Sequence, residues 1–124
     1  MTNEDLIIET KDLQKDYYDG GNVIHALKGA NIKIYRGEMV GIMGPSGSGK
    51  STLLYVLGLL HPPTGGVYLF KGQNMLDYTK EEQANFRNRE LGFVFQTCDL
   101  LANSTVFENL ELPLIYAEAD RSIR

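Results

Sequence analysis

Apolar and polar positions alternate through much of the first third of the chain. Residues 6–10 and 12–18 are rich in β-favouring side chains, and the turn-forming sequence D-G-G-N at 19–22 separates them from a similar run at 23–27. Residues 30–35, A-N-I-K-I-Y, continue the alternation with a period of two. The pattern predicts a β-hairpin followed by a half-exposed strand.

Three later runs are apolar on nearly every side, which indicates burial. Residues 39–43 (M-V-G-I-M) and 91–95 (L-G-F-V-F) have the length of strands, and we expect both to be buried in a core sheet. Residues 50–60 are long enough for a helix and are apolar almost all round, so this helix is expected inside the protein. The sequence P-P-T-G-G at 62–66 marks the end of the helix.

The middle of the chain predicts a strand, a turn and a surface helix. Residues 67–70 are typical of a strand, and residues 71–74 are typical of a turn. A charged, exposed helix is expected over residues 79–89, with Thr79 as its N-cap.

A final helix is expected over residues 106 to about 112. Ser104 and Thr105 both have side chains that can cap its N-terminus, and the sequence leaves the choice between them open. Pro113 lacks a backbone N–H group, so we expect a break or kink there.

The composition fits a soluble globular domain of 124 residues with a single core, since 43% of the residues are apolar and 23% are charged. The formal net charge of −4 gives no basic surface for nucleic acid, so no nucleic-acid partner is expected. Cys98 has no second cysteine to pair with, and the N-terminus lacks the basic start and apolar stretch of a signal peptide. A cytoplasmic location is the simplest interpretation.

The sequence G-P-S-G-S-G-K-S-T at residues 44–52 matches the phosphate-binding pattern G-x-x-x-x-G-K-[ST], between a predicted buried strand and a predicted buried helix. In that pattern, backbone N–H groups and the positive end of the helix surround phosphate oxygens. The Lys50 ammonium group would bridge the β- and γ-phosphates, and the Ser51 hydroxyl would bind Mg²⁺. The predicted nucleotide contacts in the loop are Gly44, Ser46, Gly47, Ser48, Gly49, Lys50, Ser51 and Thr52.

The alternative for residues 44–52 is a glycine-rich turn that happens to precede a helix. Glycine makes up about 7% of an average sequence, so the specified positions seldom coincide by chance between a strand and a helix. His25 and His61 are isolated in the sequence and are better explained as surface or core histidines than as metal ligands. Cys98 is better explained as an inert thiol than as a nucleophile.

Two features outside the loop narrow the class of phosphate-binding protein. Tyr17 lies on a predicted strand before the loop, and Gln96 directly follows the predicted strand F-V-F. Together with the loop and the P-T-G-G turn at 63–66, these stretches resemble the ATP-binding domains of ABC transporters. The resemblance covers essentially the whole chain and implies that Tyr17 stacks on adenine, with Tyr18 as the alternative. It also implies that Gln96 reaches Mg²⁺ and the attacking water, which makes Lys50 and Gln96 the predicted catalytic residues.

The resemblance implies an α/β fold, a P-loop NTPase core with an antiparallel β subdomain of the ABC ATPase type. Residues 1–124 would form the N-terminal part of one such domain, with an adenine region at about 5–35, the phosphate loop and helix at about 39–60, and a glutamine-loop region at about 91–112. Complete members continue with an LSGGQ-type signature, a strand ending in Asp-Glu and a switch histidine, none of which follows Gln96. We therefore expect a domain truncated before the signature motif and the second acidic strand.

The function implied by the resemblance is that of an ATP-binding subunit that uses MgATP to drive a membrane permease at the inner face of the cell membrane. The sequence after Gln96 looks like the branch that includes lipoprotein-release, macrolide-export and antimicrobial-peptide-export ATPases. The implied partners are a transmembrane permease subunit, docked just after Gln96, and a second ATP-binding domain in a head-to-tail homodimer. ATP hydrolysis is expected in a complete dimer, and binding without turnover in this chain alone. The alternatives are a non-catalytic nucleotide-binding module, or a soluble P-loop kinase or GTPase.

Overall fold

The computed structural model describes residues 3–97, 100–119 and 122, so the predicted inert thiol of Cys98 lies outside the described residues. The chain forms two compact units, Met1–Thr79 and Lys80–Arg124. A short 3-10 turn, Asn3–Asp5, opens the first unit, and a four-stranded antiparallel sheet follows it. The sheet confirms the predicted antiparallel β subdomain.

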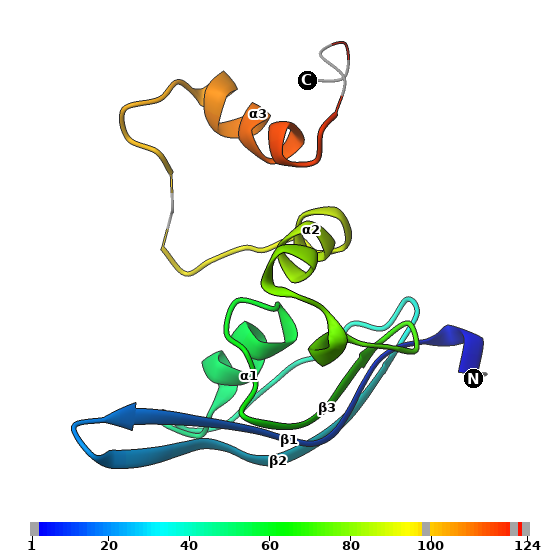
Figure 1. Ribbon diagram of the computed structural model, residues 1–124, viewed down its shortest axis with the longest axis vertical. Coiled ribbons are helices and arrows are strands. Elements are labelled where there is room, and N and C mark those ends of the chain that lie inside the picture. The colour runs from blue at the N-terminus through cyan, green and yellow to red at the C-terminus, as the bar shows by residue number, and fades with distance from the viewer. Residues whose placement is uncertain (1–2, 98–99, 120–121, 123–124) are drawn as a thin grey trace. The chain divides into compact units, whose positions relative to one another are not determined.

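The predicted hairpin is the longest feature of this sheet (Figure 1). Strands β1 (Leu6–Asp19) and β2 (Asn22–Tyr35) pair antiparallel along their whole length. Gly20 and Gly21 turn the chain between them with φ angles of 54° and 88°, which glycine adopts without steric cost. The runs predicted separately at 6–10 and 12–18 form one strand, β1, and those at 23–27 and 30–35 form one strand, β2. The strands are continuous because their pairing continues through local irregularities.

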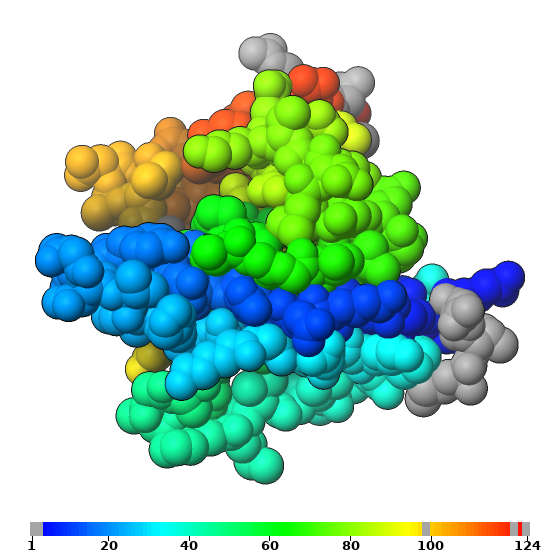
Figure 2. All heavy atoms as spheres, turned by 60° about the horizontal axis from the view of Figure 1, so that its bottom comes forward, coloured from blue at the N-terminus to red at the C-terminus, as the bar shows by residue number. Residues whose placement is uncertain are grey.

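Two further strands complete the sheet. Strand β3 (Gly65–Phe70) pairs with the free edge of β1, and β4 (Gln73–Asn74) pairs with β3, which gives the order β2-β1-β3-β4. The space-filling view shows β1 running between β2 and the segment that carries β3 (Figure 2). The predicted strand at 67–70 is confirmed, and the predicted turn is a tight one between β3 and β4.

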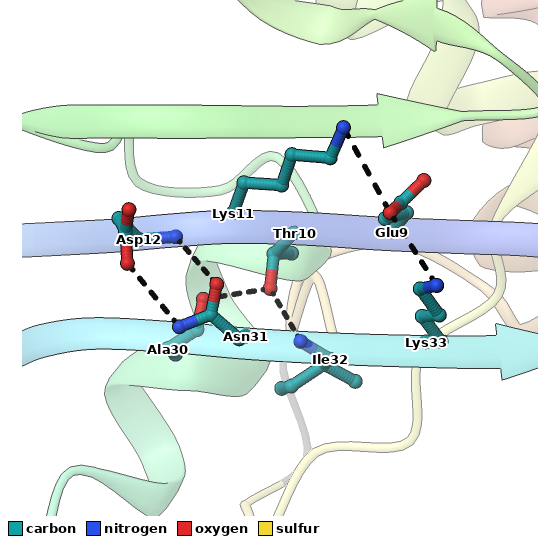
Figure 3. Close-up of polar contacts among 8 residues, drawn as sticks. All are labelled: Glu9, Thr10, Lys11, Asp12, Ala30, Asn31, Ile32 and Lys33. Carbon is teal, nitrogen blue, oxygen red and sulfur yellow. Dashed lines mark hydrogen bonds and ion pairs between the residues drawn. The ribbon is translucent and has the colours of Figure 1, made fainter.

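Strand β1 changes register between Thr10 and Leu13, and one buried hydroxyl group satisfies the backbone there (Figure 3). Thr10 is 2% exposed, donates from Oγ1 to the carbonyl of Ala30 over 2.9 Å, and accepts from the N–H of Ile32 over 3.1 Å. This side chain provides hydrogen bonds where an irregularity interrupts the ladder. The irregular stretch of β1 therefore remains joined to β2.

Further polar side chains beside Thr10 contact one another within β1 and across to β2 (Figure 3). Asp12 has a left-handed φ of 48°, and its N–H group donates to Asn31 Oδ1 over 3.0 Å. Glu9 Oε1 lies 4.0 Å from the Lys11 ammonium group and 3.9 Å from that of Lys33. Ion pairs with exposed lysines at these distances contribute little to stability, so the Asn31 amide is the more important support for the backbone at Asp12.

The core of the first unit lies between the sheet and helix α1 (Lys50–Leu57). Tyr68 of β3 is fully buried and donates its hydroxyl to the carbonyl of Leu57 over 2.5 Å. This bond satisfies one of the carbonyl groups that every helix C-terminus leaves open, and burial raises the pKa of the Tyr68 phenol above its ordinary value. The buried apolar residues are Leu13, Leu27, Leu53, Val56, Leu57, Leu59, Tyr68, Phe70 and Met75.

The helix predicted over residues 50–60 is confirmed, but it is shorter and less buried than its composition predicts. It ends at Leu57, and Leu59 has a left-handed φ of 60°. Leu53 and Val56 are buried, whereas Leu54 is 55% exposed. An apolar helix is buried on all sides only when other elements cover all of its faces, and the exposed side of α1 shows that the core packs against one face.

The two predicted buried strands at residues 39–43 and 91–95 are wrong, because neither run forms a strand. Met39 is 101% exposed and Val94 is 103% exposed. A strand is stable when a neighbouring strand supplies its backbone hydrogen bonds, and in the described ranges of the chain neither run has such a neighbour. An apolar run indicates a tendency to be buried, but the strand itself depends on a partner elsewhere in the fold.

The second unit contains the predicted surface helix, α2 (Lys80–Glu90), and the predicted final helix, α3 (Val106–Tyr116). Thr79 directly precedes α2, which is the N-cap position predicted for it. The Asn88 side chain of α2 donates to the carbonyl of Pro113 in α3 over 3.1 Å.

In the described ranges, no helix has the length and apolar character needed to cross a membrane.

The start of α3 settles the choice between the two predicted caps. Thr105, rather than Ser104, is the N-cap: its Oγ1 accepts from the N–H of Glu108 over 3.1 Å, and Glu108 Oε2 accepts from the N–H of Thr105 over 2.9 Å. Pro113 lies inside the helix, which continues to Tyr116. Of the break or kink predicted at Pro113, the break is wrong, since the hydrogen bond from Ala117 N–H to the Pro113 carbonyl (3.0 Å) continues the helix beyond it.

Candidate nucleotide-binding site

Residues 44–49 curl into a tight turn directly before α1. The N–H of Ser48 donates to the carbonyl of Pro45 over 3.1 Å, and Gly47 and Gly49 have φ angles of 80° and 96°. Glycine reaches these angles readily and other residues do not. Gly49 is the N-cap residue of α1 and has no side chain to bond the first N–H groups of the helix, so these groups and the positive helix end can meet an anion.

The loop packs closely on β2 and on itself. A Cβ atom on Gly49 would lie 2.5 Å from the carbonyl oxygen of Ala26, and a Cβ atom on Gly44 would lie 2.7 Å from Ser48 Oγ. Both distances are too short for real contacts, so residues larger than glycine fit at neither position without movement of their neighbours. Gly49 is thus required by packing as well as by its backbone conformation, whereas the close contact at Gly44 is with the Ser48 side chain.

A hollow of about 420 Å³ lies between the loop and β2. Residues 25–30 of β2 line one side, and Gly47 and Ser48 of the loop line the other. The volume falls in the range of about 300–1,000 Å³ that is common for small-molecule sites. His25 and Lys28 are among the residues that line the β2 side, so a ligand on the loop would also meet this strand.

The Lys50 ammonium group donates a hydrogen bond to the carbonyl of Gly44, the first residue of the loop. The side chain thus folds back across the loop instead of extending into solvent. A charged phosphate oxygen is a stronger acceptor than a neutral carbonyl, so Lys50 is placed to exchange one acceptor for the other. Ser51 is exposed in the first turn of α1, Thr52 beside it is half-buried, and Ser46 is exposed in the loop.

The residues of the site could hold Mg²⁺ only together with the phosphates of a bound ligand. The described residues contain no group of three or more His, Cys, Asp or Glu side chains that could hold a metal ion. Mg²⁺ commonly keeps several waters and binds through one or two protein groups together with substrate phosphates. The exposed hydroxyl of Ser51 at the start of α1 matches that kind of site.

Tyr17 lies half-buried on β1, and its neighbour Tyr18 is 73% exposed. Adjacent strand residues point to opposite faces, so the two rings are on different sides of the hairpin. Tyr17 is paired with Ile24 of β2, one residue before His25, which lines the hollow beside the loop. The structure therefore brings the predicted adenine residue and the phosphate loop to the same half of β2.

Gln96 belongs to the second unit, where it lies exposed in a bend directly after Phe95. The rings of Phe93 and Phe95 stack with their centroids 5.5 Å apart and their planes at 9°. Because Gln96 and the phosphate loop lie in different units, the contacts of Gln96 with Mg²⁺ and with the attacking water stay predictions.

Two histidines make side-chain contacts that hydrophobic patterning does not predict. His25 Nδ1 lies 2.8 Å from Asp16 Oδ1, a pairing that could be read from the sequence, because a two-residue turn fixes the register of the hairpin. His61 Nδ1 shares a hydrogen bond of 2.8 Å with the hydroxyl of Tyr17, although the two residues are 44 positions apart. No local signal predicts the second contact, which depends on how the segment after α1 packs on β1.

Known proteins are similar in sequence to this chain over most of its length. The sequence profile of the ABC transporter family matches residues 27–124. The macrolide export ATP-binding/permease protein MacB of Haemophilus ducreyi is 45% identical over 118 residues, which are 95% of this chain and 17% of that protein. The lipoprotein-releasing system ATP-binding protein LolD of Pseudoalteromonas translucida is 44% identical over 111 residues, which are 90% of this chain and 48% of that protein.

A solved structure shares the fold as well as the sequence. The ATP-binding cassette MJ0796, in a dimeric post-hydrolysis state bound to ADP and Pi, superposes with a TM-score of 0.83 at 42% sequence identity. The match covers 90% of this chain and 48% of the cassette. The chain thus spans about half the length of LolD and MJ0796 and a smaller part of MacB.

Proposed function

Since the chain belongs to the ABC transporter family, we propose that residues 44–52 bind MgATP and that the chain acts as part of an ATP-binding subunit that drives a membrane permease. The observation that supports this proposal is the position of the loop between β2 and the start of α1. Gly49 lies against the Ala26 carbonyl of β2 and leaves the first N–H groups of α1 without a side-chain cap. N–H groups without a side-chain cap at a helix N-terminus are suited to binding the oxygens of a triphosphate.

The relatives support the same assignment. The fold is that of the ABC ATPases, and MacB and LolD are the ATP-binding proteins of a macrolide exporter and a lipoprotein-releasing system. MJ0796 holds ADP and Pi, the products of ATP hydrolysis, on this fold. ATP is therefore the nucleotide that we assign to the loop.

Each residue of the proposed site has its own task. Lys50 would leave the Gly44 carbonyl and bridge the β- and γ-phosphates, while backbone N–H groups of the loop surround the phosphate oxygens. The Ser51 hydroxyl would bind Mg²⁺, and the Gln96 amide would join the metal and orient the attacking water. Ser46 and Thr52 would bond phosphate oxygens from the two sides of the loop.

Equilibrium titration tests the proposed function directly. The chain is titrated with a fluorescent ATP analogue in the presence of Mg²⁺, and the analogue is then displaced by ATP or by inorganic tripolyphosphate. Both competitors are expected to displace it, ATP at the lower concentration because it also contacts Tyr17. A chain that binds neither competitor contradicts the assignment of the loop.

Replacing Tyr17 by alanine is expected to weaken ATP binding by on the order of 1–3 kcal/mol, because an aromatic ring that stacks on a base is lost. Displacement by ATP measures the loss, and displacement by tripolyphosphate should not change. Tyr18→Ala is the matched control, since Tyr18 is exposed on the other face of the hairpin. If Tyr18→Ala has the larger effect, the adenine contact belongs to Tyr18.

We expect the 124-residue chain by itself to bind ATP without steady turnover. Phosphoryl transfer needs metal, water and charge placed together, and this chain supplies Lys50, Ser51 and Gln96 but no signature motif. Phosphate release is measured for the chain alone and after mixing with a complete ABC cassette. Steady release by the chain alone would show that these three side chains suffice for catalysis.

The proposed partners are a second ATP-binding domain and a transmembrane permease. MJ0796 forms a dimer, and MacB combines ATP-binding and permease functions in one protein. In the second unit, Phe107 is 61% exposed and Leu110 is 70% exposed on α3, next to Glu108. An apolar surface of this kind is suited to a permease helix, which would place the subunit at the inner face of the membrane.

A further inference from the structure

The ring of Tyr17 is held at its edge by a residue from beyond α1. Its hydroxyl lies 2.8 Å from His61 Nδ1, and the two rings meet edge to face with their centroids 6.0 Å apart and their planes at 83°. The His61 ring in turn packs against the ring of Tyr55 in α1, with a centroid distance of 5.1 Å. Tyr17 is thus connected through His61 to the helix that begins at the phosphate loop.

A second contact covers one face of the same ring. The Lys15 ammonium group lies over Tyr17, 5.0 Å from the ring centroid, and donates to the carbonyl of Pro62 over 2.7 Å. Pro62 follows His61 directly, so both contacts come from one short segment. The bound hydroxyl and the Lys15 contact on one face therefore fix the orientation of the Tyr17 ring.

The backbone after His61 is itself fastened to β1. The N–H of Thr64 donates to the carbonyl of Gln14 over 2.8 Å, and the N–H of Asp16 donates to Thr64 Oγ1 over 2.9 Å. The N–H of His61 donates to the carbonyl of Tyr55 over 3.2 Å. Residues 61–64 are therefore held at both ends, and the imidazole of His61 is a fixed partner for the Tyr17 hydroxyl.

We propose that His61 is a positioning residue that orients the Tyr17 ring for stacking on the nucleotide base. The inference rests on the proposed function, because it concerns the same ATP site. A ring that is already oriented loses less conformational freedom when the base binds, and this difference appears as affinity. Because His61 contacts the Tyr17 ring and is not a residue of the loop, its effect is expected only for ligands that carry a base.

Four variants of the full 124-residue chain test the role of His61 by displacement titration. His61→Phe keeps a ring for packing on Tyr55 but removes the hydrogen bond, and Tyr17→Phe removes the same bond from the other side. Each is expected to weaken MgATP binding roughly two- to tenfold, as for the loss of one hydrogen bond. The double variant should lose no more than either single one. His61→Asn returns a polar group near the position of Nδ1 and should bind ATP more tightly than His61→Phe.

Magnesium tripolyphosphate, which has no base, separates positioning from folding. Its affinity should be the same for wild type and for all His61 and Tyr17 variants, which also shows that the loop is intact in each. Tyr18→Phe is the control for loss of a tyrosine hydroxyl on the exposed face of β1, and it should bind both ligands as wild type does.

The outcomes distinguish this inference from the proposed function. If wild type binds MgATP more tightly than tripolyphosphate but His61→Phe binds both as wild type does, His61 does not position the ring and the inference alone is wrong. The same holds if His61→Phe loses affinity equally for both ligands, since the effect is then structural. If wild type binds neither ligand, the proposed function is wrong and the inference falls with it.

Discussion

Replacing Lys50 by alanine is expected to weaken MgATP binding by roughly ten- to a hundredfold, because losing a charged hydrogen-bond partner costs about 1.5–3 kcal/mol. The Lys50 ammonium group already lies on the loop, bonded to the Gly44 carbonyl. It therefore needs only to exchange acceptors to reach a phosphate. Displacement of a fluorescent ATP analogue by ATP, in the presence of Mg²⁺, measures the effect.

Tripolyphosphate should lose as much affinity as ATP in Lys50→Ala, since the contact is to phosphate and not to the base. Lys80→Ala provides the matched control, because Lys80 is an exposed lysine at the start of α2 and its loss changes the net charge by the same amount. It should leave both affinities unchanged. Equal ATP affinities for wild type and Lys50→Ala would remove the loop from consideration as the phosphate site.

Replacing Gly66 by alanine is expected to lower the free energy of unfolding by about 2–5 kcal/mol, since it combines backbone strain with overpacking. Gly66 has a φ of 90°, and a Cβ atom there would lie 2.3 Å from the carbonyl oxygen of Asp12 and 2.7 Å from the Cα of Leu13. The obstacle is the backbone of β1 at its change of register, which cannot move aside as a side chain can. Urea unfolding followed by circular dichroism measures the loss.

Gly21→Ala separates the two causes of that loss. Gly21 has nearly the same φ, 88°, but a Cβ atom there would have nothing within 4 Å. Its cost should be that of the backbone conformation alone, about 1–2 kcal/mol. If the two variants unfold at the same urea concentration, the close approach of β3 to β1 at Gly66 is not a tight contact in solution.

Local patterns predicted the elements whose stability depends on neighbours along the chain. The D-G-G-N turn at 19–22 fixed the hairpin, because two glycines supply the positive φ angles that a two-residue turn needs. The helix at α3 followed from its capping residues, and Thr105 and Glu108 form a reciprocal capping box. In both cases the decisive contacts lie within four residues of one another.

Patterns failed where the outcome depended on a distant partner. Residues 39–43 and 91–95 have the apolar character of core strands, yet in the described ranges each lacks a neighbouring strand and is exposed. The helix after the loop is apolar nearly all round, but packing selects one face of it for the core. Side-chain character gives the tendency to be buried, whereas burial itself depends on what lies alongside.

The sequence by itself predicted the chemistry of the candidate site, and it determined the family of the protein. The motif at residues 44–52 specifies positive φ angles, a lysine and a hydroxyl in a fixed order, and those properties belong to the residues wherever the loop lies. The tertiary structure alone decided what surrounds them: Gly49 against the Ala26 carbonyl, Gly66 against the backbone of Asp12, and His61 on the hydroxyl of Tyr17. The physical reason is sequence separation, because contacts between residues tens of positions apart exist only after helix and sheet have packed together, and no local preference encodes them.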